Sequence, residues 1–211
     1  MTSFDHPIFV ESIRRIKTQL GSTGFGPVEQ QVLERLIHSS GDFEVAKMLA
    51  FSKGACQKGI SAIKAGALIL TDTDMAASAV KPMARRTFQC EVRSIMEWSP
   101  EESPPGSTRS SEGLQLAWKQ LCDELEDKCP PILVIGSAPK ALTVFLELVL
   151  QGHIAPSLII GMPVGFVGVA ESKYQLSRSS ISHIRLEGSR GGAGLAASTI
   201  NALMRAAFNG Y

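Results

Sequence analysis

The stretch LIIGMPVGFVGVAESK, residues 158–173, decides the fold of this chain. Its first three residues form an apolar run, and the glycine-rich segment GMPVGFVGVAESK follows at 161–173. Glycine lets backbone N–H groups approach a ligand closely, and a strand that ends in such a turn before a helix is where open α/β sheets bind ligands. The alternative is that Gly165 and Gly168 only relieve crowding at a tight turn.

Other apolar runs end in a similar way. Residues 67–70 lead into Thr71 and Asp72, and residues 132–135 lead into a glycine and a serine. Helical patterns follow these runs at 75–80, 139–150 and 167–176, and a last strand at 183–186 precedes a helix at 195–208. Strands that alternate with helices predict a mostly parallel central sheet covered on both faces, which is a three-layer α/β/α fold.

The first fifty residues predict helices rather than strands. Apolar residues recur at helical spacing over 13–20 and again over 28–37, and GSTGFGP separates the two helices. A third helix is expected from near Asp42 through Leu49, with Ser40 or Asp42 as its cap.

The composition indicates one balanced globular unit. The chain has 211 residues, of which 44% are hydrophobic, so we expect residues 1–211 to form a single domain with a loop at 99–107. Twenty-one Lys and Arg oppose twenty Asp and Glu, which gives a net charge of +1. Such a charge provides no overall field toward nucleic acid or an anionic membrane.

Neither a membrane segment nor a metal site is expected from the sequence. No apolar run approaches the roughly 20 residues that a membrane span needs, and the start MTSFDHPIF lacks the basic and apolar regions of a leader. We therefore expect a cytosolic protein. Cys56, Cys90, Cys122 and Cys129 form no CxxC pair and accompany no histidine cluster, which favours reduced packing residues and no protein-bound metal.

His38 is the candidate proton donor. It lies at the expected end of the second helix, just before Ser39, Ser40 and Gly41. The negative end of the helix dipole favours imidazolium, so His38 can hold a proton near neutral pH and deliver it to a substrate as a general acid. The alternative is that the side chain only hydrogen-bonds the last helix carbonyls.

Arg109 stands where a helix is expected to begin. It follows Ser107 and Thr108, either of which can cap that helix. A cation in a first helical turn is unfavourable unless an anion binds there as well. The alternative is a surface ion pair with Glu112 or Glu102.

Arg190 lies in the glycine-rich segment GSRGGAG, residues 188–194. Its glycines expose backbone N–H groups, which suit a phosphate or a carboxylate. No lysine followed by Ser or Thr closes the segment, so it is not a nucleotide loop of the GxxxxGK[ST] type. Gly-rich turns without a ligand are also common.

Asp72 and Asp74 form a DxD pair at a strand exit. Such a pair can hold Mg²⁺ for phosphoryl transfer, but no acidic pair elsewhere obviously completes the site. Helix capping by Asp72 or Asp74 is the favoured alternative. The candidate sites together indicate an anionic ligand, one proton donor and no GxSxG nucleophile, which favours isomerisation or group migration over hydrolysis.

Several stretches together resemble the precorrin-8X methylmutase family, including its cobalt-precorrin-8 counterparts. The matching stretches occur in family order and span nearly the whole chain: RLIHSSGDFE (35–44), KAGALILTDTDM (64–75), STRSS (107–111), VIGSAPKAL (134–142), GMPVGFVGVAESK (161–173) and the glycine run at 188–194. Only the last departs from the family pattern, because Ser189 stands where the family usually has Arg, and Ala193 where it has Ser.

The resemblance implies an isomerase of cobalamin biosynthesis. A methyl group would migrate from C-11 to C-12 of a corrinoid ring, giving hydrogenobyrinic acid or its cobalt form, cobyrinic acid. The shift is intramolecular and needs neither an external methyl donor nor a cofactor, since any cobalt is carried by the substrate. The family also implies a homodimer with the ring near the interface, and a hand-over of product to the next enzyme is a further expectation.

The resemblance also assigns roles to residues. His38 matches the catalytic histidine, which would protonate the macrocycle or stabilise its protonated tautomer. The other matching residues would contact the substrate: Ser39, Ser40, Arg109, Ser110, Gly161, Pro163, Gly165, Gly168, Arg190, Gly191 and Gly192. Two alternatives stay open, namely a non-catalytic corrinoid carrier and a Mg²⁺-dependent phosphotransferase that uses Asp72 and Asp74.

Overall fold

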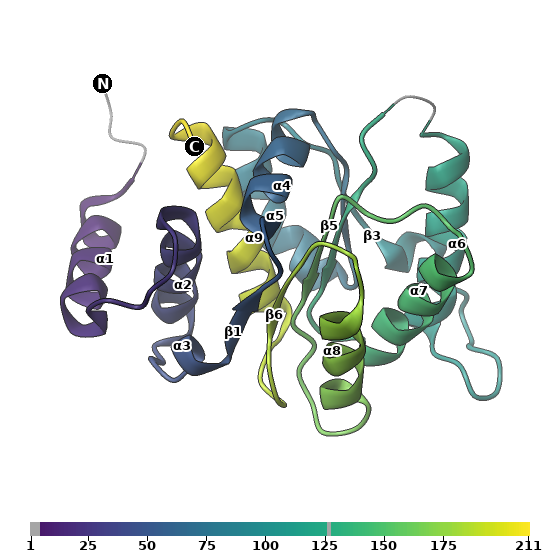
Figure 1. Ribbon diagram of the computed structural model, residues 1–211. Coiled ribbons are helices and arrows are strands. Elements are labelled where there is room, and N and C mark those ends of the chain that lie inside the picture. The colour runs from purple at the N-terminus through teal and green to yellow at the C-terminus, as the bar shows by residue number, and fades with distance from the viewer. Residues whose placement is uncertain (1–4, 126–127) are drawn as a thin grey trace.

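The computed structural model describes residues 5–125 and 128–211. In this part of the chain, six strands form one sheet in the order β1-β6-β5-β4-β2-β3. They are β1 Leu49–Phe51, β2 Ile69–Thr71, β3 Val92–Ser94, β4 Ile132–Ile135, β5 Leu158–Gly161 and β6 His183–Leu186. All neighbours are parallel except β1 and β6. Helices cover both faces, which confirms the predicted three-layer α/β/α fold (Figure 1).

The helices divide between the two faces of the sheet. Their bounds are α1 Pro7–Leu20, α2 Pro27–Ser40, α3 Val45–Met48, α4 Ala55–Lys64, α5 Asp74–Arg86, the 3₁₀ helix η1 Ile95–Trp98, α6 Arg109–Asp123, α7 Pro139–Leu150, α8 Val169–Arg178 and α9 Ala193–Phe208. Helices α4, α5 and α9 pack on one face, and α6, α7 and α8 on the other. Helix α2 packs on α9 and α1 packs on α2, so α1 is the outermost element on its side (Figure 1).

The central strands build both cores. Side chains alternate between the faces of a strand, so Ile132 and Val134 of β4 join the core on the α9 side, while Leu133 and Ile135 join the opposite core. All four are fully buried. Burying each such side chain contributes about 1.5–3 kcal/mol. The apolar run at 132–135, which predicted a buried strand, therefore packs against helices on both faces of the sheet.

Several predicted elements have the bounds that the sequence indicated. Residues 132–135 and 183–186 are strands, residues 139–150 are a helix, and segment 99–107 is a loop between η1 and α6. Helix α8 begins at Val169 rather than at residue 167, because Gly168 lies before it with φ 70°, outside the helical region. All four cysteines are free, as expected, and Cys56 and Cys90 are buried.

The prediction of a third helix from near Asp42 through Leu49 is largely wrong. Helix α3 is a single turn over Val45–Met48, and Leu49 begins β1, which pairs antiparallel with β6 at Leu186. Asp42 accepts a hydrogen bond from the N–H of Glu44 at 2.9 Å, so it stabilises the turn before this helix. A strand of three residues spans too little of the alternating pattern to be separated from a helix end in sequence. For the same reason β3 was not predicted.

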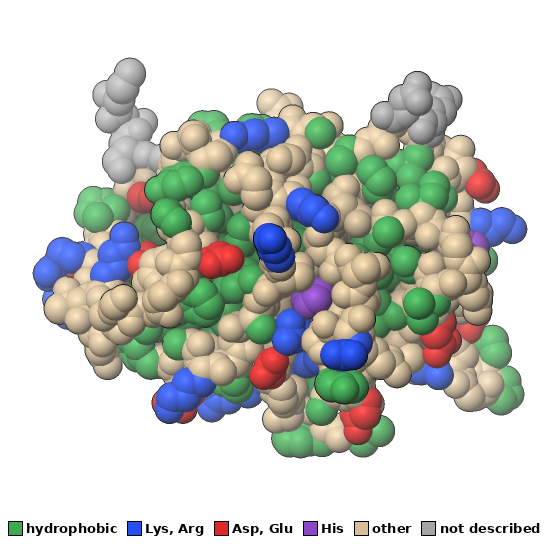
Figure 2. All heavy atoms as spheres, viewed as in Figure 1, with side chains coloured by type: hydrophobic (Ala, Val, Ile, Leu, Met, Phe, Trp, Pro, Cys, Tyr) green, Lys and Arg blue, Asp and Glu red, His purple; other side chains and the backbone are tan. Residues whose placement is uncertain are grey.

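The described residues can be compared with what a membrane span requires, and the distribution of their side chains is seen on one face of the molecule. None of their helices has the length and apolar character required to cross a membrane. Acidic, basic and apolar side chains are interspersed on the face seen in Figure 2. This distribution agrees with the balanced charge of the sequence.

Candidate active site

Two loops meet at the carboxyl edge of the sheet, where β5 and β6 end. The N–H of Gly165 donates to Ser189 O at 3.1 Å, and the N–H of Gly192 donates to Met162 O at 2.9 Å. A Cβ at Gly191 would overlap Met162 O, so only glycine fits there. The glycine-rich segments at 161–168 and 188–192, which are separate in sequence, therefore form one surface.

Lys173 supports this surface from below. Its side chain is buried, with a relative exposure of 2%, and Nζ donates to the carbonyls of Gly188 at 2.8 Å and Arg190 at 2.5 Å. Burial lowers the pKa of Lys173 to about 8. Sequence reasoning missed this role, because the lysine of AESK reaches carbonyls 15 and 17 residues away.

The loop at 188–191 keeps its N–H groups available. The carbonyls of Gly188 and Arg190 bind Lys173, and that of Ser189 accepts from Gly165. In the described part of the chain, the backbone N–H groups of Ser189, Arg190 and Gly191 have no partner. Unpaired N–H groups in an exposed glycine loop are donors for an anion.

The first loop presents apolar side chains to solvent. Phe166 and Val167 are 95% and 89% exposed, and Val164 is also exposed. Apolar side chains reach the surface at the lower end of Figure 2, where Figure 1 shows this loop. Gly161 and Pro163, which the sequence also predicts as ligand contacts, are buried. A Cβ at Gly161 would overlap Leu176 of α8, so this glycine permits close packing.

The end of α2 holds His38. The helix stops at Gly41, which has φ 66° and donates its N–H to Ile37 O at 2.8 Å. The Nδ1 atom of His38 lies 2.8 Å from Ser12 Oγ of α1, and the Phe9 ring meets the imidazole edge-on with centroids 5.0 Å apart. His38 thus bonds to a side chain of another helix rather than to the last carbonyls of its own helix.

An ion pair joins the end of α2 to the second loop. Arg190 pairs with Asp42, which follows the helix stop at Gly41. Ser39 accepts a hydrogen bond from Ser198 of α9 at 2.8 Å, and Ser40 donates to Leu36 O. A hollow of about 430 Å³ between α2 and α9 includes Ser39, Ser40 and Gly191 in its lining. The structure therefore brings together the predicted residues on α2 and those at 190–192.

The surroundings of His38 add two effects that the sequence argument did not include. Burial lowers the pKa of the imidazole, and the positive charge of Arg35, one turn earlier in α2, lowers it further. Both effects oppose the helix dipole, which favours imidazolium. His38 is therefore neutral at pH 7 in this state.

Residues 7–206 match one family. The family model of precorrin-8X methylmutases matches residues 7–206. This chain belongs to the precorrin-8X methylmutase family. It is a methylmutase, an isomerase of cobalamin biosynthesis.

Relatives and solved structures agree with this assignment. The chain is 31% identical to a cobalt-precorrin-8 methylmutase of Synechocystis over 99% of both chains, and 36% identical to a precorrin-8X methylmutase of Pseudomonas aeruginosa over 93% of both. The crystal structure of a precorrin-8X methylmutase from Thermus thermophilus superposes with a TM-score of 0.84, at 36% identity and 96% coverage of both chains.

Arg109 and Ser110 lie elsewhere on the methylmutase. Thr108 caps α6 by accepting from the N–H of Ser111 at 3.1 Å, which confirms the predicted cap. The Nε of Arg109 donates to Pro100 O at 2.7 Å, so the expected pairing with Glu112 or Glu102 is not what the structure shows. Figure 1 shows α6 and α2 on opposite sides of the molecule. One chain therefore does not bring Arg109 to His38.

Asp72 closes another part of the same edge. Its Oδ2 accepts from the N–H groups of Gly136 at 2.9 Å, Ser137 at 2.5 Å and Ala138 at 2.9 Å. Burial raises the pKa of this carboxyl, and the three N–H groups oppose the rise. The expected capping of α5 falls to Thr73, which accepts from the N–H of Ala76. A fully buried carboxylate engaged in this way is not placed to hold Mg²⁺ for a phosphotransferase.

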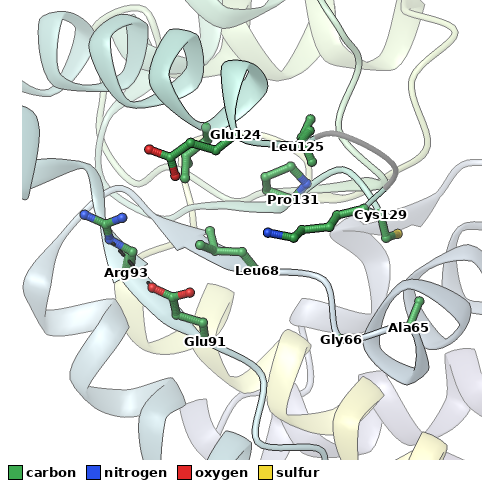
Figure 3. A pocket seen from close by; sticks show the side chains of 11 residues that line it. Ala65, Gly66, Leu68, Glu91, Arg93, Glu124, Leu125, Cys129 and Pro131 are labelled. Carbon is green, nitrogen blue, oxygen red and sulfur yellow. Dashed lines mark ion pairs between the residues drawn. The ribbon is translucent and has the colours of Figure 1, made fainter.

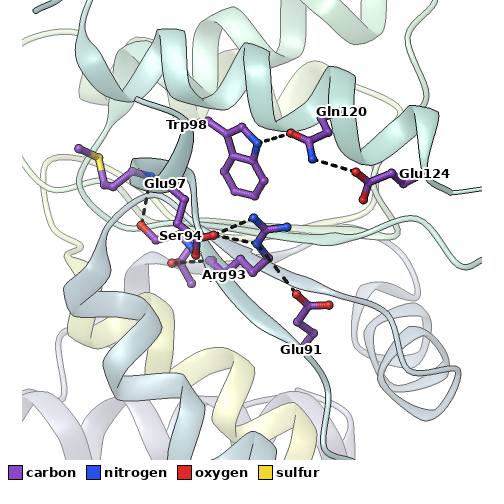
Figure 4. Close-up of polar contacts among 9 residues, drawn as sticks. Glu91, Arg93, Ser94, Glu97, Trp98, Gln120 and Glu124 are labelled. Atoms are coloured by element: carbon purple, nitrogen blue, oxygen red, sulfur yellow. Dashed lines mark hydrogen bonds and ion pairs between the residues drawn. The ribbon is translucent and has the colours of Figure 1, made fainter. Parts of the chain in front are cut away.

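A larger hollow, of about 710 Å³, lies at the amino ends of β2, β3 and β4 (Figure 3). Its Arg93 is already occupied: the guanidinium pairs with Glu97 at 2.8 Å and stacks on Trp98 at 4.0 Å (Figure 4). Trp98 in turn donates to Gln120 at 2.7 Å. Because parallel sheets bind ligands at their carboxyl ends, this hollow is a weaker candidate than the edge with His38.

Proposed function

We propose that this methylmutase moves a methyl group from C-11 to C-12 of precorrin-8 or cobalt-precorrin-8. The bond from C-11 to the methyl carbon breaks as the bond to C-12 forms, in an intramolecular [1,5] shift. The product is hydrogenobyrinic acid or cobyrinic acid. The reaction requires no external methyl donor and no cofactor, because any cobalt belongs to the substrate.

One observation carries the proposal: Ser39 and Ser40, which follow His38 at the end of α2, line a hollow together with Gly191. Gly191 belongs to a loop whose carbonyls are occupied and whose N–H groups have no partner in the described residues. The Asp42–Arg190 ion pair fixes the end of α2 against that loop. A corrinoid of this kind bears several acetate and propionate carboxylates, which suit the N–H groups of Ser189, Arg190 and Gly191. In the complex, Arg190 would exchange Asp42 for a substrate carboxylate or share its charge between the two.

Binding of the anionic substrate favours uptake of a proton from solvent by His38. Carboxylates that arrive beside His38 favour its charged form and raise its pKa, against the effects of burial and Arg35. The protonated imidazole then donates to the macrocycle as a general acid, or stabilises the protonated tautomer, and so promotes migration. The acid form is thereby coupled to the presence of substrate.

The apolar loop supports the ring itself. Val164, Phe166 and Val167 offer an exposed apolar surface beside the unpaired N–H groups, which matches a broad ring with a polar periphery. Ser39 and Ser40 provide hydroxyl groups in the hollow that Gly191 also lines. Holding the flexible ring in its reactive conformation provides part of the rate.

We also propose a homodimer. Arg109 and Ser110 are exposed or partly exposed at the start of α6, on the far side of the molecule from His38. In a dimer, the partner's α6 can bring these residues to the ring. A second copy would also cover apolar side chains such as Phe166, which are unusual on the surface of a monomer.

Replacement of His38 tests the proposed function. His38→Ala is expected to lower turnover of precorrin-8 by 100-fold or more, in the range that a general acid contributes, about 10²–10⁴. The visible spectrum follows both conversion of the substrate and binding of the product. His153→Ala, at an exposed histidine after α7, is the matched control and should retain turnover.

Two outcomes would contradict the proposal. Full turnover by His38→Ala would remove His38 from the mechanism. A wild-type protein that binds the product but converts no substrate would be a corrinoid carrier rather than an isomerase.

A further inference from the structure

Helix α1 reaches the site through one polar contact. It lies outside α2, and Ile16 is its one buried residue among those described (Figure 1). Yet Ser12 Oγ lies 2.8 Å from Nδ1 of His38, across 26 residues of sequence. This contact joins the outermost helix to the candidate general acid.

The spacing along α1 explains how the contact is made. Phe9, Ser12 and Ile16 are separated by three and four residues, so they share one face of the helix. Ile16 is buried on that face, and Phe9 lies edge-on to the imidazole. The imidazole of His38 is therefore confined by a ring edge and by a hydroxyl at Nδ1.

Phe9 is itself held by cations. The guanidinium of Arg35 on α2 lies 5.1 Å from the centre of the Phe9 ring, and that of Arg205 on α9 lies 4.6 Å from it. Arg205 also pairs with Asp5. Contacts from both α2 and α9 thus fix the face of α1 that carries Ser12.

We propose that Ser12 is a positioning residue that holds Nδ1 of His38 and leaves Nε2 as the atom that donates the proton. A hydroxyl can both accept and donate, so it can remain bonded to the ring in each protonation state. It accepts from the Nδ1–H of imidazolium, and it can donate to a bare Nδ1 of neutral imidazole. The inference rests on the proposed function, in which His38 is the acid.

The charged groups near His38 leave the uncharged hydroxyl of Ser12 as its hydrogen-bond partner. Arg35 faces the imidazole from α2, Arg205 lies on the far side of Phe9, and Glu11 on α1 is engaged by Arg14 and Arg15. No carboxylate among the described residues bonds to His38. A carboxylate there would hold the ring protonated at all times, whereas a hydroxyl leaves the charge to be set by the substrate.

The test compares three variants by kinetics at several pH values. Ser12→Ala should lower kcat by about 10- to 100-fold with little change in KM, because a ring that turns away from its target loses orientation. The fall in rate at high pH should move to lower pH, since imidazolium loses an acceptor. Ser12→Thr keeps the hydroxyl and should restore most of kcat. Thr18→Ala removes an exposed hydroxyl from the same helix and should change nothing.

NMR of the free protein gives a readout that requires no substrate. The ¹⁵N shift of His38 Nδ1 should differ from that of exposed His153, and should move toward it in Ser12→Ala. If Ser12→Ala fails to fold, the wild-type shifts and Ser12→Thr still decide the question. If His38→Ala turned over normally, the proposed acid would be wrong, whereas the NMR result would report on the Ser12 contact alone.

Unchanged shifts and an unchanged pH profile in Ser12→Ala would overturn the inference. A loss of rate that Ser12→Thr does not restore would also overturn it, because it would show a packing effect rather than a role of the hydroxyl.

Discussion

Two buried charges on the carboxyl edge of the sheet have opposite effects on what that edge can bind. Asp72, between β2 and β4, accepts from three backbone N–H groups, which are the donors that an anion would need. Lys173, beneath the loop after β6, binds two carbonyls and leaves the neighbouring N–H groups available. Asp72 therefore occupies the N–H groups at one part of the edge, whereas Lys173 leaves the N–H groups at another part available to an anion.

This comparison explains where the candidate site lies. The strand order reverses between β4 and β2, which is where many open α/β sheets bind their ligands. In this methylmutase Asp72 fills that position, and the free donors lie in the loop after β6, which the Asp42–Arg190 ion pair joins to the end of α2. The sign of the buried charge, rather than the topology alone, determines which loop can receive an anionic substrate.

The largest expected effect comes from removing the charge that closes the edge. Asp72→Ala leaves three N–H groups without an acceptor, two of them buried, and should lower the free energy of unfolding by about 3 kcal/mol or more. Urea denaturation measures the loss. Asp74→Asn, two residues later and exposed at the start of α5, should cost no more than about 0.3–1 kcal/mol. Equal effects of the two substitutions would contradict the assigned role of Asp72.

The contact between the two glycine loops can be tested by adding one methyl group. Gly191→Ala places a Cβ against Met162 O and should cost about 2 kcal/mol, together with weaker binding of the product. Gly194→Ala lies only three residues further on, in α9, where nothing lies within 4 Å of the added carbon. It should be neutral or stabilise the fold by up to about 1 kcal/mol. Thermal unfolding of both variants would show whether the loops are as close as described.

Lys173, which leaves the loop N–H groups available, should have a smaller effect on stability, and this effect should depend on pH. Folded Lys173 loses its proton near pH 8, whereas the unfolded chain holds it to about pH 10.5, the ordinary value. The unfolded state therefore binds more protons in this window, and this group favours the folded state increasingly as pH rises through it.

Stability curves between pH 7 and 10.5 check this expectation. Lys173→Met should remove the contribution, so the difference in stability between wild type and variant should shift in favour of wild type as pH rises. Exposed Lys140→Met on α7 is the control and should show no such trend. A difference that does not vary with pH would show that Lys173 titrates at its ordinary value.

The sequence predicted what short-range patterns determine. The apolar runs at 132–135 and 158–160 identified buried strands, and Pro139 marked the first turn of a helix. The sequence also placed His38 at a helix end, because Gly41 follows three residues later and ends the helix. These features depend on neighbours along the chain, so they could be found without coordinates.

Long-range contacts decided the rest. Asp72 binds residues 64 to 66 positions away, and Ser12 reaches His38 across 26. The sequence could not show these pairings, because they depend on how the strands are ordered. The pKa of His38 depends on contacts of the same kind: the sequence shows the helix end, but it does not show the burial against α1 or the approach of Arg35.

The most direct test of the account is the pKa of His38 with and without the corrinoid product, measured by ¹⁵N NMR. In the free protein we expect a pKa below the ordinary value of 6.5. With the product bound, its carboxylates should raise the pKa of His38 toward neutrality or above. A pKa that stays the same or falls on binding would contradict a site in which an anionic substrate charges its own proton donor.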